Sequence, residues 1–386
     1  MYDDPMDEEL KGPELAALVR RVFSPRPGEK ALAVLVDLPD AEIPDNPAWK
    51  ERRELAAGWV GELEGSDLGL AARLVFYRNA HTSNGELPEF CWLHDGGPLP
   101  PSAEALPPVL AIPWAALFKE HPILIAPTEF SATAPLKMLA KKHPIRAATM
   151  PGFNAAMIPA LRLDYGEVSR RVSRLKELLD RAEGADIRFR HPGGECSLHL
   201  DLRFRLGHAS GGLIPEPGMA GNLPSGEAYI VPYEGENEPS RSAGELPVQF
   251  GPEVVRYRIS GNRAVEVLSR GPESSREAER LKSEPAYANL AELGLGVLAG
   301  MGIKPVGEIL LDEKLGLHIA FGRSDHFGGQ VGPKDFSSPA AVIHIDRVYL
   351  AETQPRVTVL GVDLVFEGGR SIALMRGGDY VEGVFA

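Results

Sequence analysis

Five side chains that can bind metal ions lie in the C-terminal half of this 386-residue chain, each inside a run of apolar and glycine residues. They are Glu227, Glu292, His318, His344 and Asp346. Two imidazoles and three carboxylates suit one or two divalent ions of hard to intermediate character. The fold must therefore bring polar groups that are far apart in sequence to one place inside an apolar environment.

The clearest of these runs is Ala341–Asp346, in which valine and isoleucine surround His344 and Asp346. Such a run predicts a buried strand, and residues i and i+2 of a strand point to the same face. His344 and Asp346 therefore point to one side, as two ligands of one ion would. The alternative is a strand with a polar face in solvent, which the apolar neighbours disfavour. A buried carboxylate needs a metal or a cationic partner.

The other three side chains are ambiguous when each is taken alone. His318 lies in a second strand-like run, where a histidine is most often a core side chain. His344 and Asp346 need a third partner to hold an ion, and this favours His318 as a metal ligand. Glu227 follows a Pro-Ser-Gly turn, and Glu292 is expected on a helix from Lys282 to Gly294. Glutamates in such positions are usually solvated.

Taken together, these residues resemble one family. The resemblance lies in the runs Asn222–Glu227, Ala291–Gly296, Asp312–Gly322 and Ile343–Asp346. They look like the aminopeptidase T family of metallopeptidases, often labelled thermophilic or leucyl aminopeptidases. The resemblance covers roughly residues 120 to 380 and is strongest from 220 to 350, and the first 110 residues match poorly.

The resemblance implies a metalloaminopeptidase that removes N-terminal residues from peptides with a water activated by two metal ions. The implied cofactors are two divalent ions, Zn, Co or Mn. The implied ligands are Glu227, Glu292, His318, His344 and Asp346. Which glutamate bridges the ions stays open. The resemblance also implies a homodimer.

One position departs from the pattern of that family. The family carries a tyrosine seven residues after the first histidine, where this chain has Asp325 in the run Gly322–Gly329. A phenol donates a hydrogen bond to an oxyanion and an ionised aspartate cannot, so either His326 takes over or the reaction differs. Asp325, His326 and Glu292 are thus the predicted catalytic residues. Arg323 and His326 suit a substrate carboxylate; the plainer interpretation is a glycine-rich loop with incidental charges.

A second class of enzyme stays open because of that departure. Two histidines and one carboxylate form the facial triad of non-haem iron oxygenases, and His318, His344 and Asp346 are such a set. The dihydroxypyridine ring-cleaving dioxygenases resemble the same fold and use such a triad with Fe(II). Glu227 and Glu292 favour the two-metal hydrolase, because a mononuclear iron site would not need them. They also disfavour a third class, a non-catalytic relative.

Composition and motifs disfavour several further classes of protein. The net charge of −13 disfavours a nucleic acid as partner. No apolar run approaches about 18–20 residues, so we expect no membrane span. Cys91 and Cys196 are far apart, and the acidic start shows no signal peptide, which together predict a cytoplasmic protein with free thiols. No nucleotide-binding or serine-hydrolase motif is present.

The order of the predicted elements indicates the fold class. An amphipathic helix at Glu14–Phe23 precedes a buried strand at Lys30–Asp37, and this alternation continues, which predicts an α/β domain over residues 1–160. From Ile187 onward short strands dominate. We therefore expect a β-rich α+β domain over residues 161–386 that binds the metal ions and carries out catalysis.

Overall fold

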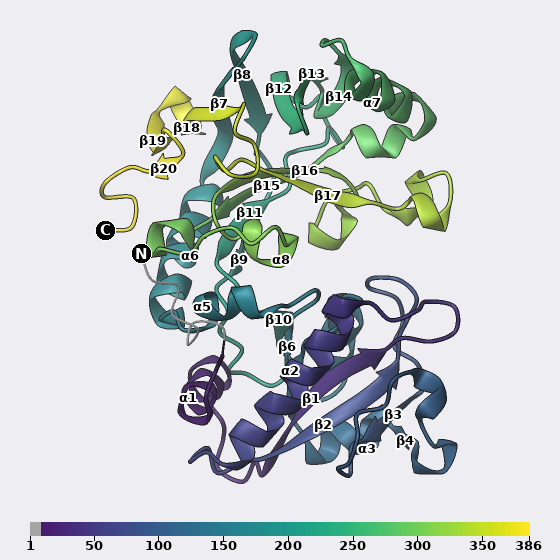
Figure 1. Cartoon of the computed structure of the whole chain (residues 1–386). Helices are drawn as coiled ribbons and strands as arrows, with labels where there is room; N and C mark the ends of the chain where they lie inside the picture. Colours follow the sequence, from purple (N-terminus) through teal and green to yellow (C-terminus); the bar gives the residue numbers. More distant parts are fainter. Residues whose placement is uncertain (1–8) are drawn as a thin grey trace. The chain divides into compact units, whose positions relative to one another are not determined.

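The computed structural model describes residues 9–386 and has a mixed α/β fold with three β-sheets (Figure 1). The mixed α/β class expected from the sequence is confirmed. The chain divides into two compact units. The first comprises Met1–Glu167 and Gly212–Ser225, and the second comprises Val168–Gly211 and Gly226–Ala386.

A seven-stranded sheet forms the centre of the first unit, with the order β10-β6-β5-β1-β2-β3-β4. Its strands are β1 (Ala31–Leu38), β2 (Ala71–Arg78), β3 (Phe90–Leu93), β4 (Ile112–Pro113), β5 (Ile123–Ala126), β6 (Arg146–Thr149) and β10 (Ala220–Asn222). β1, β2, β5, β6 and β10 run parallel, whereas β3 and β4 pair antiparallel. β1 is buried along nearly its whole length, as a parallel strand covered on both faces should be.

The helices of this unit are α1 (Gly12–Phe23), α2 (Pro47–Glu64), α3 (Trp114–Glu120), α4 (Thr133–Ala140) and α5 (Ile158–Leu161). α2 has a typical N-terminal cap, because the Asn46 side chain accepts a hydrogen bond from the Trp49 amide at 2.9 Å and Pro47 follows the cap. Within residues 9–386, every helix of the chain is too short or too polar to span a lipid bilayer.

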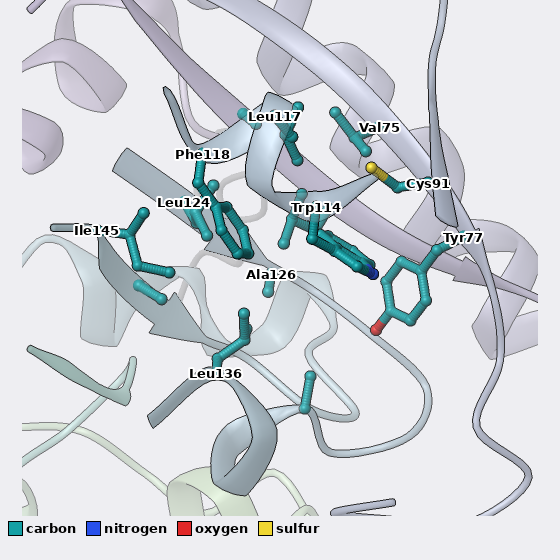
Figure 2. Close-up of a cluster of buried hydrophobic side chains, with 14 of the residues drawn as sticks. Val75, Tyr77, Cys91, Trp114, Leu117, Phe118, Leu124, Ala126, Leu136 and Ile145 are labelled. Carbon is teal, nitrogen blue, oxygen red and sulfur yellow. The ribbon is translucent and has the colours of Figure 1, made fainter. Parts of the chain in front are cut away.

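A buried hydrophobic cluster joins α3 and α4 to one face of this sheet (Figure 2). Trp114 is central to it, since its ring lies 5.5 Å from that of Tyr77 and 5.8 Å from that of Phe118. The Trp114 indole donates to the carbonyl of Pro88, so its polar atom is satisfied. Cys91 lies in the same cluster, where burial raises the pKa of its thiol to about 12. This cysteine is therefore structural and not a reactive thiolate.

The second unit holds two antiparallel sheets and the helices α6 (Tyr165–Leu179, which begins in the first unit), α7 (Pro272–Ser283) and α8 (Ile309–Asp312). The eight-stranded sheet comprises, in spatial order, β14 (Arg263–Val267), β13 (Glu253–Ser260), β12 (Ala243–Phe250), β8 (Gly194–Asp201), β7 (Ala182–His191), β18 (Thr358–Phe366), β19 (Ser371–Arg376) and β20 (Asp379–Tyr380). The five-stranded sheet comprises β17 (His344–Val348), β16 (Leu317–Gly322), β15 (Leu290–Gly296), β11 (Glu227–Ile230) and β9 (His208–Ser210).

The helix predicted from Lys282 to Gly294 is wrong in its second half. Glu292 does not lie on a helix, because α7 ends at Ser283, a short 3-10 turn follows, and Glu292 belongs to strand β15. The apolar spacing in this segment resembled a helical stripe, but every residue of β15 is buried, so no alternation is visible in its sequence. Pro285 ends the helical pattern. The Glu292 carboxylate is consequently buried and not solvated.

Candidate metal centre

The five-stranded sheet brings all five predicted ligands to one face. Directly opposed residues of antiparallel strands share a face, as do alternate residues of one strand. The opposed pairs are Glu227–Gly296, His318–Gly294, Glu292–Ala320, Asp346–Ala320 and His344–Gly322. Each ligand therefore stands opposite a glycine or an alanine on at least one neighbouring strand, which leaves room on the sheet surface for the polar side chains.

The His318 side chain fills the space above Gly294. A Cβ atom at this position would lie 1.8 Å from Nε2 of His318 and 2.1 Å from its Cε1. The imidazole of His318 thus lies directly over the Gly294 backbone, and no other residue type fits there without moving the ring.

The ligand atoms form two overlapping triplets that share Glu292. Atoms of Glu227, Glu292 and His318 lie within 4.8 Å of one another, and so do atoms of Glu292, His344 and Asp346. His318 Nε2 is 3.3 Å from Glu292 Oε1, and His344 Nε2 is 3.4 Å from Glu292 Oε2. Ligand atoms that are each about 2.1 Å from one ion lie about 3.0–3.4 Å apart, so this spacing fits metal coordination.

Both histidines are oriented by backbone carbonyls. Nδ1 of His344 lies 2.7 Å from the carbonyl oxygen of Arg323, and Nδ1 of His318 lies 3.3 Å from that of Gly316. An Nδ1–H that donates to a carbonyl leaves Nε2 directed at the carboxylates, which is the usual arrangement of metal-binding histidines. His344 and Asp346 keep 18% and 10% of their side chains exposed, so the centre is open on the side of β17.

Lys314, which no sequence motif indicated, is also buried in this centre. Nζ of Lys314 donates to Glu227 Oε1 at 2.5 Å and also to the carboxylate of Glu313, and its side chain is 1% exposed. Glu227 Oε2 is buried, has no hydrogen-bond partner, and lies 3.5 Å from Nε2 of His318. An unsatisfied buried carboxylate oxygen beside an imidazole nitrogen is where a cation fits.

Mutual charge sets the protonation of the ligands. Burial by itself raises the pKa of the Glu292 carboxyl, but hydrogen bonds from His318 and His344 outweigh it and hold that pKa well below its usual range. Burial by itself lowers the pKa of His318, but the hydrogen bond to Glu292 and the charge of Glu227 raise it to about 9. Without a metal ion, protonated imidazoles therefore balance the carboxylates.

The glycine-rich loop after β16 lies next to His344. The His326 ring is 5.2 Å from the His344 ring, and burial together with the charge of His344 lowers the pKa of His326 to about 4. Asp325 Oδ1 accepts a hydrogen bond from Arg323 Nε at 2.6 Å, so its charge is already paired. Of the two predicted catalytic residues in this loop, only His326 contacts a ligand ring.

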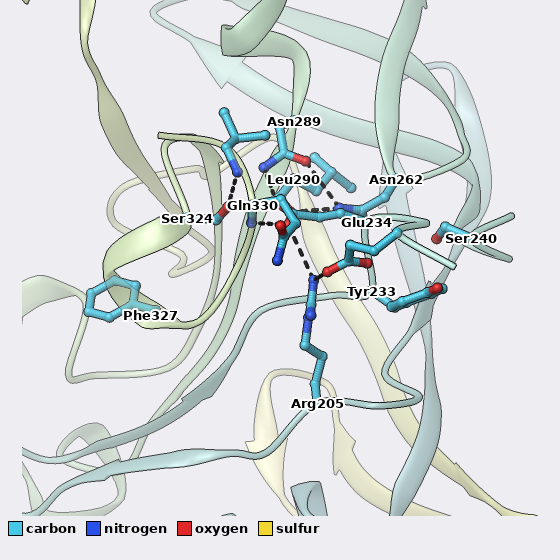
Figure 3. Close-up of polar contacts among 12 residues, drawn as sticks. Arg205, Tyr233, Glu234, Ser240, Asn262, Asn289, Leu290, Ser324, Phe327 and Gln330 are labelled. Carbon is cyan, nitrogen blue, oxygen red and sulfur yellow. Dashed lines mark hydrogen bonds and ion pairs between the residues drawn. The ribbon is translucent and has the colours of Figure 1, made fainter. Parts of the chain in front are cut away.

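One carboxylate, that of Glu234, anchors this loop to the sheet, and its side chain is 6% exposed (Figure 3). It accepts hydrogen bonds from Ser324 Oγ at 2.6 Å, the Gln330 amide at 2.5 Å, Asn289 Nδ2 at 2.7 Å and Arg205 Nη2 at 3.2 Å. The two ends of the loop are thereby tied to one point. The sequence contained no signal for this role, because Glu234 lies far from the loop along the chain.

Three aromatic rings form a wall beside the ligands: His208, Tyr229 and Phe327. His208 stacks on Tyr229 with ring centres 5.0 Å apart, and Tyr229 lies 4.8 Å from Phe327. Phe327 in turn lies 5.6 Å from the His344 ring, and its carbonyl is 3.0 Å from Nε2 of His208. This aromatic wall places flat apolar surface next to the candidate metal ligands.

Another group of potential ligands lies elsewhere in the second unit, and its hydrogen bonds do not suit a metal. His191, Cys196 and Glu245 are close together, but the Gly193 amide donates to His191 Nδ1 at 3.0 Å. Nε2 of a neutral His191 therefore carries the proton and faces Glu245 at 3.5 Å. Glu245 also pairs with Arg256 at 3.1 Å.

Neither a family model nor a curated protein matches this sequence. Among solved structures, the fold is similar to that of 2,5-dihydroxypyridine dioxygenase from Pseudomonas putida KT2440. The TM-score is 0.59 and the sequence identity 15%, and the match covers 97% of this chain and 99% of that chain. At this identity the similarity is one of fold.

This comparison corrects the family expected from the sequence. The assignment to the aminopeptidase T family, and with it the hydrolase and protease activity, is contradicted, because the similar structure is that of a dioxygenase. The quoted motifs specify strands that carry the candidate ligands opposite small residues. This arrangement does not by itself distinguish a hydrolase from an oxygenase. The reaction depends on other residues, and Asp325 already departed from the aminopeptidase pattern. The catalytic roles of Glu292, Asp325 and His326, and the homodimer, stay predictions.

We predict that Gly294→Ala weakens metal binding by at least about tenfold, because the new methyl group displaces the His318 ring, which contacts the carboxylate of Glu292. The measurement is metal content after dialysis at defined free metal. Gly58→Ala is the matched control, since a Cβ there meets nothing within 4 Å. Equal affinity in both variants, with both folded, would contradict the placement of His318.

We also predict that metal binding releases protons. His318 has a pKa of about 9 and that of His344 is raised well above its usual value, so both are protonated at pH 7. His344 must lose its proton to bind an ion, and a cation on Glu292 replaces the charge that holds the proton on His318. Affinity should rise with pH and level off once these groups are neutral in the free protein. Calorimetry of Zn²⁺ or Mn²⁺ binding in buffers of different ionisation enthalpy measures this release. A binding enthalpy independent of the buffer would be inconsistent with this role of the two histidines.

Proposed function

We propose that this protein is an iron-dependent dioxygenase that cleaves a small hydroxylated aromatic ring, with one ferrous ion at the metal centre. The observation that carries the proposal is the meeting of two oriented imidazoles with the carboxylates of Glu292 and Asp346 on one buried sheet face. Imidazole nitrogens and carboxylate oxygens are the protein ligands of non-haem ferrous iron. The triplet Glu292, His344 and Asp346 supplies one imidazole and two carboxylates, and so departs from the usual set of two histidines and one carboxylate. The similarity of fold to a dihydroxypyridine dioxygenase supports the same reaction class.

Glu292, His344 and Asp346 would hold the ion, and His318 lies across the Glu292 carboxylate from them. His318, His344 and Asp346, the triad expected from the sequence, do not form one of the compact triplets among residues 9–386; Glu292 takes the place of His318 in the triplet with the other two. Bound ferrous iron would supply the redox chemistry by which dioxygen reacts with an aromatic ring.

The surroundings of the centre suit an aromatic substrate. The aromatic wall offers ring faces beside His344, and stacked aromatic pairs contribute about 0.5–1.5 kcal/mol beyond the area they bury. His326 has its pKa lowered to about 4 by burial, so its imidazole is neutral and can accept a hydrogen bond from a ring hydroxyl. These residues would orient a flat, hydroxylated ring towards the ion.

We expect iron-loaded protein to consume oxygen with 2,5-dihydroxypyridine or another dihydroxylated ring. His344→Ala should reduce this uptake to background, because it removes a proposed iron ligand, the imidazole that the Arg323 carbonyl orients. The surface histidine variant His199→Ala is the control. The assay is an oxygen electrode after anaerobic loading with Fe(II). Absence of uptake by wild-type protein with every dihydroxylated ring tested would refute the proposed reaction.

We further expect Phe327→Leu to raise the KM for an aromatic substrate by about two- to tenfold, the range that corresponds to one lost ring contact. Iron content should be unchanged, because Phe327 contacts His344 only through its ring. Phe90→Leu, a partly exposed phenylalanine of the first unit, serves as control. An unchanged KM would show that Phe327 does not contact the substrate.

A further inference from the structure

Lys314 lies within the metal centre and is almost fully buried. Its backbone is fixed there, since its carbonyl accepts a hydrogen bond from the Leu298 amide at 2.9 Å. Gly296 makes room for it: a Cβ at Gly296 would lie 2.2 Å from the Lys314 carbonyl carbon. The same glycine stands opposite Glu227 in the sheet. The fold therefore places the lysine beside this ligand.

The lysine ammonium already neutralises one of the two triplets. Glu227 uses Oε1 to accept the hydrogen bond from Lys314, so only Oε2 is left to face His318 and Glu292. An ion bound by Glu227, Glu292 and His318 would share the Glu227 carboxylate with a full positive charge. Among residues 9–386, no lysine or arginine side chain forms an ion pair with the carboxylate of Glu292 or Asp346; their ion-pair partners are histidines.

The charges balance with a single ion. Glu227, Glu292 and Asp346 carry three negative charges when ionised. With both imidazoles neutral in the metal-bound protein, Lys314 and one divalent ion supply three positive charges. Burial raises the pKa of Glu313, the other acceptor of Lys314, and so favours its neutral form. A second divalent ion would leave the centre with an uncompensated double positive charge, which is costly beside the buried side chains of Glu227, Glu292 and His318.

We propose that the Lys314 ammonium takes the place of a second metal cation, so that the five-ligand centre binds one divalent ion beside Glu292, His344 and Asp346. Glu227, which a mononuclear iron site would not require, then serves as the counter-ion of the lysine. This inference rests on the metal centre of the proposed function but not on its reaction. Removing the charge of Lys314 should open the Glu227, Glu292 and His318 triplet to a second ion.

The test is the number of metal ions per chain. Wild-type protein and Lys314→Met are dialysed against Mn²⁺ or Co²⁺, and the bound metal is counted by elemental analysis. We expect about one ion in the wild type and about two in the variant, as in two-metal sites. Lys314→Arg keeps the charge and should stay at about one. Lys304→Met, an exposed lysine in the same unit, is the matched control.

Electron paramagnetic resonance of the Mn²⁺-loaded proteins provides a second measurement, because two ions sharing Glu292 would couple and a single ion would not. Lys314→Gln keeps hydrogen-bond donors without the charge, and replaces Lys314→Met if that variant does not fold. Two ions in the wild type, or one ion in every folded uncharged variant, would overturn the proposal. Oxygen uptake is not involved, so failure of the dioxygenase reaction with one bound ion would leave this inference intact.

Discussion

The carboxylate of Glu292 is the group on which the centre depends. Its two oxygens face the Nε2 atoms of His318 and His344 at 3.3 and 3.4 Å, and it belongs to both ligand triplets. Without these imidazoles, burial would raise the pKa of Glu292 and favour its neutral form. Two adjacent strands, β16 and β17, therefore supply the partners that keep a carboxylate ionised in the interior of the sheet.

The sheet accommodates this polar group through small residues. Every candidate ligand faces a glycine or an alanine, and His318 lies directly on the Gly294 backbone. A loop fixed by Glu234 then brings Phe327 and His326 against His344. Rigid strands thus hold the ligands, while a loop tied at both ends supplies the surface that a substrate would meet.

Part of this arrangement could be predicted from the sequence. Period-two spacing placed His344 and Asp346 on one face, and the alternation of helices and strands indicated the α/β class. Glu292 was assigned to a helix because a strand buried on both faces shows no alternation. Lys314 and Glu234 were missed, since their partners, Glu227 and Ser324, lie far away in sequence. Motif resemblance led to strands whose polar side chains meet on one sheet face, but it suggested the wrong reaction, because those strands do not determine the substrate.

The central claim is a single iron ion held on one side of Glu292. The most direct measurement is anomalous scattering at the iron absorption edge from crystals grown anaerobically with Fe(II). The account predicts one strong peak among Glu292, His344 and Asp346, and none between Glu227 and His318, where Lys314 supplies the positive charge. Two peaks of equal height, one in each triplet, would contradict it, as would a single peak away from these residues.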